Sequence, residues 1–329
     1  MTKPCLKLTN IQALRGFAAV NVVLYHIVGN SAENGHPTNY VVTLGGSVDL
    51  FFVISGFIMV YIQFVRQREP GQFLLDRVVR IAPTYWLLNI ALGIALFAAP
   101  GLFGEMRFSV NWLINSLLFI SQPLGHNQPI LYVGWTIEYE MLFYVVFAAS
   151  LFLKSLLASI AATSLALGLL VLGLGAEIIL LEFIAGMTIG WFYLQLNPGK
   201  NLSWAALLCG SALLFSTSTM DGEMSRIIVY GIPSALIVFG ALNIVQMNSN
   251  FLTKLGDSSF SIYLIQVFTI PAFYRSLNLL GITGISGDLA AILCLVFSVL
   301  TGILLHEVFE KRSQMESRQL LRQAGATAS

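Results

Sequence analysis

Two polar side chains of types that can do chemistry lie in the first apolar stretch of the chain. Residues 10–30 are hydrophobic but contain Arg15 and His26, eleven positions apart. On a helix this spacing returns to within about 20° of the same face, with a rise of roughly 16 Å. An arginine at the centre of a bilayer costs about 2.5–3.5 kcal/mol on insertion scales, so it normally faces a protein interior or a wet cavity. The sequence therefore predicts one helix that presents a fixed cation and a titratable imidazole to the same interior.

The second apolar stretch contributes a carboxylate, Asp49, near the end expected on the same side of the membrane as His26. Two interpretations of this carboxylate stay open. Asp49 is either a helix-start acid at the membrane boundary, which the helix dipole favours, or a group that orients or charges His26 across the helix pair. The neighbouring glycines and Ser55 either let two helices approach closely or let a substrate pass.

Two arginines follow this stretch, Arg77 and Arg80, and on a helix their spacing places them on one face. Two guanidinium groups on one face can clamp a phosphate through forked hydrogen bonds. The alternative is ordinary anchoring, since basic residues gather at the cytoplasmic edge of a membrane segment. The arginine pair is therefore a candidate phosphate site.

Two acids begin a later aromatic-rich segment, Glu138 and Glu140, and they point about 200° apart on a helix. They are therefore not expected to do one job together. Glu140 lies deeper, and an unpaired carboxylate there is an acid/base candidate or a counter-ion to Arg15. A structural ion pair is the alternative for Glu140, and Glu182 is predicted to be structural.

The remaining histidines and cysteines predict no further site. His36 and His126 are expected at the surface of outside loops, and His306 at a membrane boundary. No spacing matches a zinc site or a nucleotide-binding loop, so no metal is expected. The cysteines are interpreted as buried small hydrophobic residues, namely Cys5, Cys209 and Cys294. The polar residues thus indicate acid/base chemistry without a metal.

The composition places these residues in a membrane protein. The chain has 329 residues, of which 57% are hydrophobic and only 10% charged, and its mean hydropathy is +0.80. Soluble domains carry about 25% charged residues, so this composition is typical of an all-α polytopic membrane protein. The net charge of +1 argues against a nucleic-acid partner.

About ten transmembrane helices are expected. The candidate spans lie near 11–30, 42–64, 81–100, 133–153, 155–175, 177–196, 203–219, 227–246, 257–275 and 287–307. A shorter apolar run at 111–120 cannot cross a bilayer and is predicted to be re-entrant or interfacial.

The basic residues predict the orientation. With the N-terminus inside, thirteen of the seventeen lysines and arginines lie on the cytoplasmic side and three lie outside. This bias predicts that both termini are cytoplasmic. The chain is thus divided into one transmembrane domain, 1–308, and a basic cytoplasmic tail, 309–329, in which a helical extension frays toward the end.

Five short motifs in order resemble the integral-membrane acyltransferase-3 family. They are Arg15-x10-His26; Val-Asp-Leu-Phe-Phe-Val-Ile-Ser-Gly-Phe at 48–57; Arg77-x-x-Arg80-Ile-x-Pro-x-Tyr-Trp; Trp-Thr-Ile-x-x-Glu140-x-x-Phe-Tyr; and Leu-Gly-Asp-Ser-Ser-Phe-Ser-Ile-Tyr263-Leu. The resemblance covers nearly the whole chain, and the chain is most similar to the short exopolysaccharide O-acetyltransferases of that family.

The resemblance implies transfer of an acyl group, usually acetyl, from cytoplasmic acetyl-CoA to a hydroxyl of a surface or secreted glycan. The acceptor would be that glycan or its lipid-linked precursor, in a bacterial-type inner membrane, with polysaccharide assembly proteins as further partners. His26 would be the catalytic base, and Arg15 would help to hold the donor. Glu140 would be a supporting acid, and either it or Asp49 would stabilise the imidazolium. The acyl-CoA site would comprise Arg77, Arg80, Tyr85, Trp86 and Ser55.

One departure from the family pattern bears on activity. Many relatives end the last motif with a histidine, where this chain has Gln266. Glutamine can donate or accept a hydrogen bond and so orient a substrate, but it cannot carry a proton, which leaves an inactive glycan-binding or assembly subunit open. A proton-coupled transporter or flippase that uses Arg15, His26, Asp49 and Glu140 as a relay is the other alternative. Direct transfer to the acceptor and transfer through an acetyl-histidine both stay open as routes.

Overall fold

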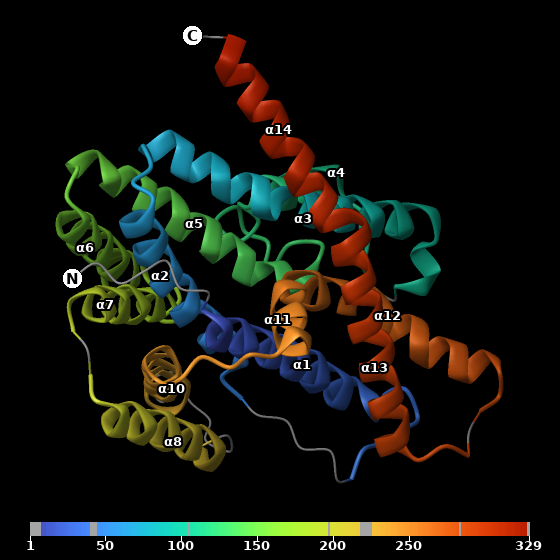
Figure 1. Cartoon of the computed structure of the whole chain (residues 1–329). Helices are drawn as coiled ribbons and strands as arrows, with labels where there is room; N and C mark the ends of the chain where they lie inside the picture. The colour runs from blue at the N-terminus through green and yellow to red at the C-terminus, as the bar shows by residue number, and fades with distance from the viewer. Residues whose placement is uncertain are drawn as a thin grey trace. The chain divides into compact units, whose positions relative to one another are not determined.

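The computed structural model describes residues 8–39, 45–103, 106–196, 198–217, 226–282 and 284–327. Every regular element in these ranges is an α-, 3-10 or π-helix (Figure 1). The expectation of an all-helical fold is therefore confirmed for this part of the chain.

A helix lies at each of the ten expected spans. In chain order these helices are α1 (Thr9–Ser31), α2 (Ser47–Val65), α3 (Pro70–Ala98), α5 (Trp135–Ser150), α6 (Leu156–Leu174), α7 (Leu180–Gln195), α8 (Lys200–Thr217), α10 (Ile232–Asn243), α12 (Ser259–Leu279) and α13 (Gly287–Leu305). Six helical segments of the described chain are long and apolar enough to cross a bilayer: Thr9–Ser31, Ser47–Val65, Pro70–Ala98, Tyr132–Leu153, Leu156–Leu174 and Gly287–Leu321. The chain is thus a multi-pass membrane protein, while ten crossings and cytoplasmic termini stay predictions.

The shorter elements connect or extend these helices. They are η1 (Pro100–Leu102), α4 (Val110–Leu117), η2 (Tyr132–Gly134), η3 (Leu151–Leu153), η4 (Ile227–Gly231), α11 (Asn250–Asp257), η5 (His306–Glu310) and α14 (Lys311–Thr327). Of these, η4 and η5 are π-helical turns. The apolar run expected at 111–120 forms α4, which has only eight residues and is too short to cross a bilayer.

Helix α3 begins eleven residues before the span expected at 81–100, at Pro70. Proline suits the first position of a helix because its missing N–H is not needed there and its φ is already helical. Arg77 and Arg80 therefore lie inside a continuous helix of 29 residues, and not in a connection before it. Pro83 lies within the same helix, one turn beyond Arg80.

The chain forms two compact units. Unit one comprises 1–25, 42–73 and 142–259, and unit two comprises 26–41, 74–141 and 260–329. Unit one therefore contains α2, α6, α7, α8, η4, α10 and α11, and unit two contains α4, η2, α13, η5, α14 and nearly all of α12.

In unit one, α2 and α7 approach so closely that their backbones touch. A Cβ at Gly56 would meet the carbonyl oxygen of Phe183, and a Cβ at Gly186 would meet the carbonyl oxygen of Val53. Gly190, one turn after Gly186, faces α2 as well, and a Cβ there would lie 2.9 Å from the Cβ of Val60. This small-xxx-small pattern lets membrane helices pack by van der Waals contact. Gly56 therefore allows close approach of two helices, which is one of the two interpretations offered for the small residues near Asp49.

In unit two, α4 and the residues after it pack on α3. Phe119, two residues after the end of α4, adopts a left-handed conformation (φ 61°), and its ring stacks on Tyr85 at 4.8 Å. The indole N–H of Trp86 donates to the carbonyl oxygen of Leu117 (2.7 Å). The carboxylate of Glu138 accepts from the backbone N–H groups of residues 121 and 122 (2.9 and 3.1 Å). These bonds fix the connection between α3 and α5 from both sides.

The last helical elements run on without a break, because α13 is followed by the π-turn η5 and then by α14 (Figure 1). A helix thus continues beyond the last predicted span, as expected for the tail. The sequence predicted that this helix frays from residue 324. In the structure it continues to Thr327. Residues 328 and 329 lie outside the described part.

The α2–α7 contact gives a first prediction. Gly186→Ala should destabilise the protein by about 1–3 kcal/mol, since the new methyl group meets backbone and cannot be accommodated by rotation of a side chain. Thermal unfolding of the purified protein in detergent measures this effect. Gly168→Ala in α6 is the matched control, because nothing lies within 4 Å of a Cβ there. Equal melting temperatures for the two variants would contradict the packing described.

Candidate active site

His26, in the last third of α1, is bonded to Gln266 of α12. The imidazole Nδ1 lies 2.8 Å from the side-chain oxygen of Gln266, and Gln266 is fully buried. Both residues belong to unit two. The residue that departs from the family motif is thus the direct partner of the predicted base.

The amide of Gln266 determines which imidazole nitrogen carries the proton. Its Nε2 donates to the backbone carbonyl oxygen of Tyr263 (2.7 Å), which can only accept. The amide cannot be turned over without setting two oxygens against each other, so its oxygen must face His26. That oxygen also only accepts, so Nδ1 of His26 carries the hydrogen. In the neutral ring, Nε2 is then the nitrogen with the lone pair, which a general base needs.

Aromatic and hydroxyl groups hold the surroundings of this pair. The ring of Tyr132 meets the imidazole edge-on, at 5.5 Å between centroids. The hydroxyl of Tyr263 donates to the carbonyl oxygen of Val133 (2.8 Å) and lies 2.9 Å from the hydroxyl of Thr136. These hydrogen bonds tie α12 to the start of α5. They fix the position of Gln266, which in turn orients the imidazole of His26.

The two acids of α5 have separate surroundings, as the spacing predicted. Glu138 is buried and holds the backbone of residues 121 and 122. Glu140 is partly buried and interacts electrostatically with the hydroxyl of Tyr263. Glu140 is therefore an acid near the same α12 motif that carries Gln266.

The arginine pair lies in α3 of unit two, where Arg77 is buried and Arg80 is partly buried. The other residues assigned to the acyl-CoA site have different surroundings. Tyr85 is fully buried against Phe119, and Trp86 is bonded to the end of α4. Ser55 lies in unit one, with its hydroxyl 3.2 Å from that of Tyr144. The roles of all five in donor binding stay predictions.

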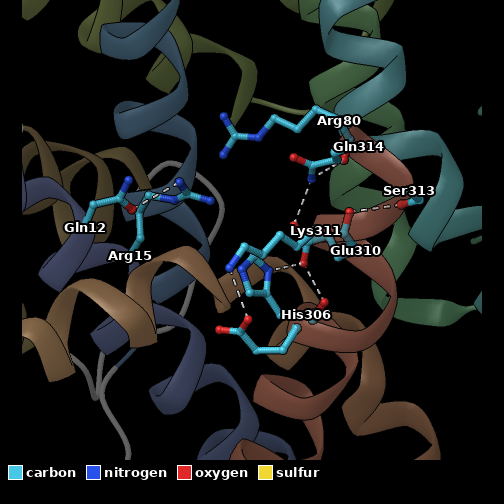
Figure 2. Close-up of polar contacts among 10 residues, drawn as sticks. Gln12, Arg15, Arg80, His306, Glu310, Lys311, Ser313 and Gln314 are labelled. Carbon is cyan, nitrogen blue, oxygen red and sulfur yellow. Dashed lines mark hydrogen bonds and ion pairs between the residues drawn. The ribbon is translucent and has the colours of Figure 1, made fainter. Parts of the chain in front are cut away.

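Asp49 and Arg15 both lie in unit one. The carboxylate of Asp49 is 1% exposed and pairs with the guanidinium of Arg226 at 3.0 Å. Glu182 of α7 is 2% exposed and interacts electrostatically with both Asp49 and Arg226. Arg15 donates to the side-chain oxygen of Gln12, one turn earlier in α1, at 3.4 Å (Figure 2).

The sequence did not indicate several of these partners. Arg226, one of the three basic residues that the charge distribution assigns to the outside, is the counter-ion of Asp49. His36 was predicted to lie at the surface, but it is 4% exposed and stacks on Tyr274 at 6.0 Å, so that prediction is wrong. The sequence singled out Gln266 as a departure from the family motif, but it did not predict that its partner is His26. Within the described ranges, no three metal-binding side chains lie together as a possible metal site.

The described chain thus combines apolar helices, an oriented imidazole in α1 and two arginines on one face of α3. The comparison with known families identifies the class, because the family model described as an acyltransferase domain matches residues 8–308. The chain belongs to the acyltransferase-3 family and is a membrane acyltransferase.

One curated relative extends this result. The exopolysaccharide production protein ExoZ of Rhizobium meliloti (strain 1021) is 33% identical over 303 residues, which cover 83% of this chain and 91% of the relative. No solved structure matches the chain.

The Gln266 contact gives a prediction for the imidazole. Nitrogen NMR of the protein labelled at histidine should show His26 with a protonated Nδ1 and an unprotonated Nε2 at neutral pH. Gln266→Leu removes the acceptor and should yield a mixture of the two tautomers. The sequence has four histidines, and His26→Ala identifies the relevant signals by their loss. A protonated Nε2 in the unmodified protein would contradict the assignment.

The carboxyl pair of unit one gives a prediction for stability. Asp49→Asn replaces a charge-assisted hydrogen bond to Arg226 and should cost about 1.5–3 kcal/mol. Glu182→Gln should be close to neutral, since its amide N–H can donate to the carboxylate of Asp49, with which Glu182 interacts. Thermal unfolding of the two variants in the same detergent provides the comparison, and a larger loss for Glu182→Gln would contradict this order.

Proposed function

We propose that this acyltransferase moves an acetyl group from cytoplasmic acetyl-CoA to a hydroxyl of a surface or secreted glycan or of its lipid-linked precursor. The observation that carries the proposal is the hydrogen bond between Gln266 and Nδ1 of His26, which makes Nε2 the basic nitrogen. Membership of the acyltransferase-3 family supports the reaction class.

The chemical step is a direct transfer. Nε2 of His26 removes the proton of the acceptor hydroxyl while its oxygen attacks the thioester carbonyl carbon. The carbon–sulfur bond then breaks, and the imidazolium returns the proton to the leaving thiolate, which departs as the free thiol of CoA. The amide of Gln266 keeps the ring in position throughout, and Glu140 adds negative potential in the same unit while the imidazolium exists.

The donor binds through its phosphates to Arg77 and Arg80. Both are on one face of α3, and the distribution of basic residues predicts that this end of α3 is cytoplasmic, where CoA is found. Guanidinium groups bind phosphate oxygens by paired hydrogen bonds, which gives the arginines a role that anchoring alone would not require.

The acceptor class rests on the relative and on the membrane setting. A protein named for exopolysaccharide production is 33% identical to this chain, and a membrane-embedded site can meet acceptors that are attached to lipid or that cross the membrane. We therefore assign the protein to the inner membrane of a bacterial-type cell, in contact with polysaccharide assembly proteins.

Acetylation of the secreted polysaccharide tests the proposal. Cells that lack the protein should produce polysaccharide with lower O-acetyl content, and the unmodified gene should restore it. His26→Ala should not restore it, since loss of a general base lowers such rates about 10²–10⁴-fold. Proton NMR of the purified polysaccharide measures the acetyl groups.

His126→Ala is the matched control. His126 lies in the connection after α4, stacks on Trp112 of that helix and takes no part in the proposed step. Full acetylation in cells that carry His26→Ala would defeat the proposal. Proton-dependent flux of a glycan precursor without acetyl transfer would favour a transporter.

A further inference from the structure

A second buried polar cluster lies in unit two, around Glu310 at the end of the π-turn η5. Glu310 is 4% exposed although it follows a membrane-spanning helix and precedes a basic tail. π-turns within α-helices are rare and occur frequently at functional sites. The cluster therefore needs an explanation beyond the end of a span.

Three side chains donate to the carboxylate of Glu310. Oε2 accepts from the hydroxyl of Ser261 (2.5 Å) and from Nδ1 of His306 (2.9 Å), and Oε1 accepts from Nε2 of Gln314 (3.2 Å) (Figure 2). Serine and histidine both donate to the acid, so this is not the order of a catalytic triad, in which the histidine would lie between the other two. Glu310 is an acceptor that gathers donors from α12, from its own turn and from α14.

The amide of Gln314 connects this acceptor to the arginine helix. Its Nε2 also lies 3.3 Å from the backbone carbonyl oxygen of Arg80, and both contacts are to groups that accept (Figure 2). An NH₂ group has two hydrogens, so the two bonds use both of them. The position of the amide is thereby fixed by Glu310 on one side and by α3 on the other.

The bonded carbonyl lies in a turn of α3 that a proline weakens. Pro83 has no N–H, so the carbonyl oxygen four residues earlier, at position 79, lacks its helical hydrogen bond. Arg80 is in that turn. The hydrogen bond from Gln314 to the carbonyl oxygen of Arg80, the residue after that position, supports this turn from outside the helix.

We propose that Gln314, oriented by Glu310, is a positioning residue that holds the turn of α3 carrying Arg80, and that it thereby sets the affinity for the phosphates of CoA. This inference rests on the donor site of the proposed function. The tail helix α14 acts through this partly buried contact. The neighbouring pair of Lys311 and Glu307 is exposed at its side chains (57% and 40%) and contributes little.

Ligand binding to the full-length protein in detergent tests the proposal, with coenzyme A and pantetheine as the two probes. Gln314→Met keeps the length of the side chain and removes both hydrogen bonds. It should weaken coenzyme A binding about 3–10-fold, which is the change in affinity expected from losing roughly one hydrogen bond. Pantetheine binding should be unchanged, because pantetheine lacks the phosphates. A general loss of structure would weaken the binding of both probes.

Gln319→Leu is the matched control, because Gln319 is an exposed glutamine on the same helix. It should bind both probes like the unmodified protein. Glu310→Gln is the second variant and is informative if Gln314→Met fails to fold. Its amide presents one acceptor in place of the carboxylate's two oxygens, so coenzyme A binding should again weaken more than pantetheine binding.

Arg80→Ala distinguishes a failure of the positioning role of Gln314 from a failure of the proposed donor site. If Arg80→Ala weakens coenzyme A binding and Gln314→Met does not, the positioning role of Gln314 is wrong and the donor site stands. If Arg80→Ala leaves coenzyme A binding unchanged, the donor site itself is wrong. Equal weakening of coenzyme A and pantetheine by Gln314→Met would show a structural role only and would also overturn the inference.

Discussion

Polar side chains within a membrane must find their partners inside the protein, because hydrocarbon offers no hydrogen bonds. The backbone meets this condition by forming helices, and the side chains meet it by bonding between helices. His26 is bonded to Gln266, Asp49 to Arg226, and Glu310 to three donors. The same requirement that stabilises the fold therefore decides how the reactive groups are oriented. In His26 it decides which nitrogen is basic.

The contacts between helices make this orientation precise. Gly56 and Gly186 bring the backbones of α2 and α7 into contact, which leaves no room for one helix to shift against the other. In unit two, the hydroxyl of Tyr263 ties α12 to the start of α5, one turn before Gln266. Interiors packed in this way hold side chains in single rotamers, so a hydrogen bond of 2.8 Å to His26 is a defined geometry.

Much of the fold could be predicted from the sequence, because hydrophobic segments of this length have few alternatives to a helix in a membrane. The shared helix of Arg15 and His26, and the shared face of Arg77 and Arg80, followed from spacing alone. The partners did not, since His26 and Gln266 are 240 positions apart and Asp49 and Arg226 are 177 apart. A periodicity shows which way a side chain points but not which distant helix it meets. His36 shows this limit, because a loop position implied exposure and the stacked Tyr274 covers it.

The π-turn at 306–310 has a consequence for the chemistry of the last helix. A π-turn amounts to one extra residue in an α-helix, and one residue corresponds to a rotation of about 100°. The face of α14 is therefore out of phase with the face of α13, so one continuous helix can present apolar residues to lipid and then turn polar residues inward. Insertions and deletions of single residues within this turn would rotate the whole tail, whereas substitutions at its exposed positions would not. The length of this segment should consequently be more restricted in evolution than most of its individual residues.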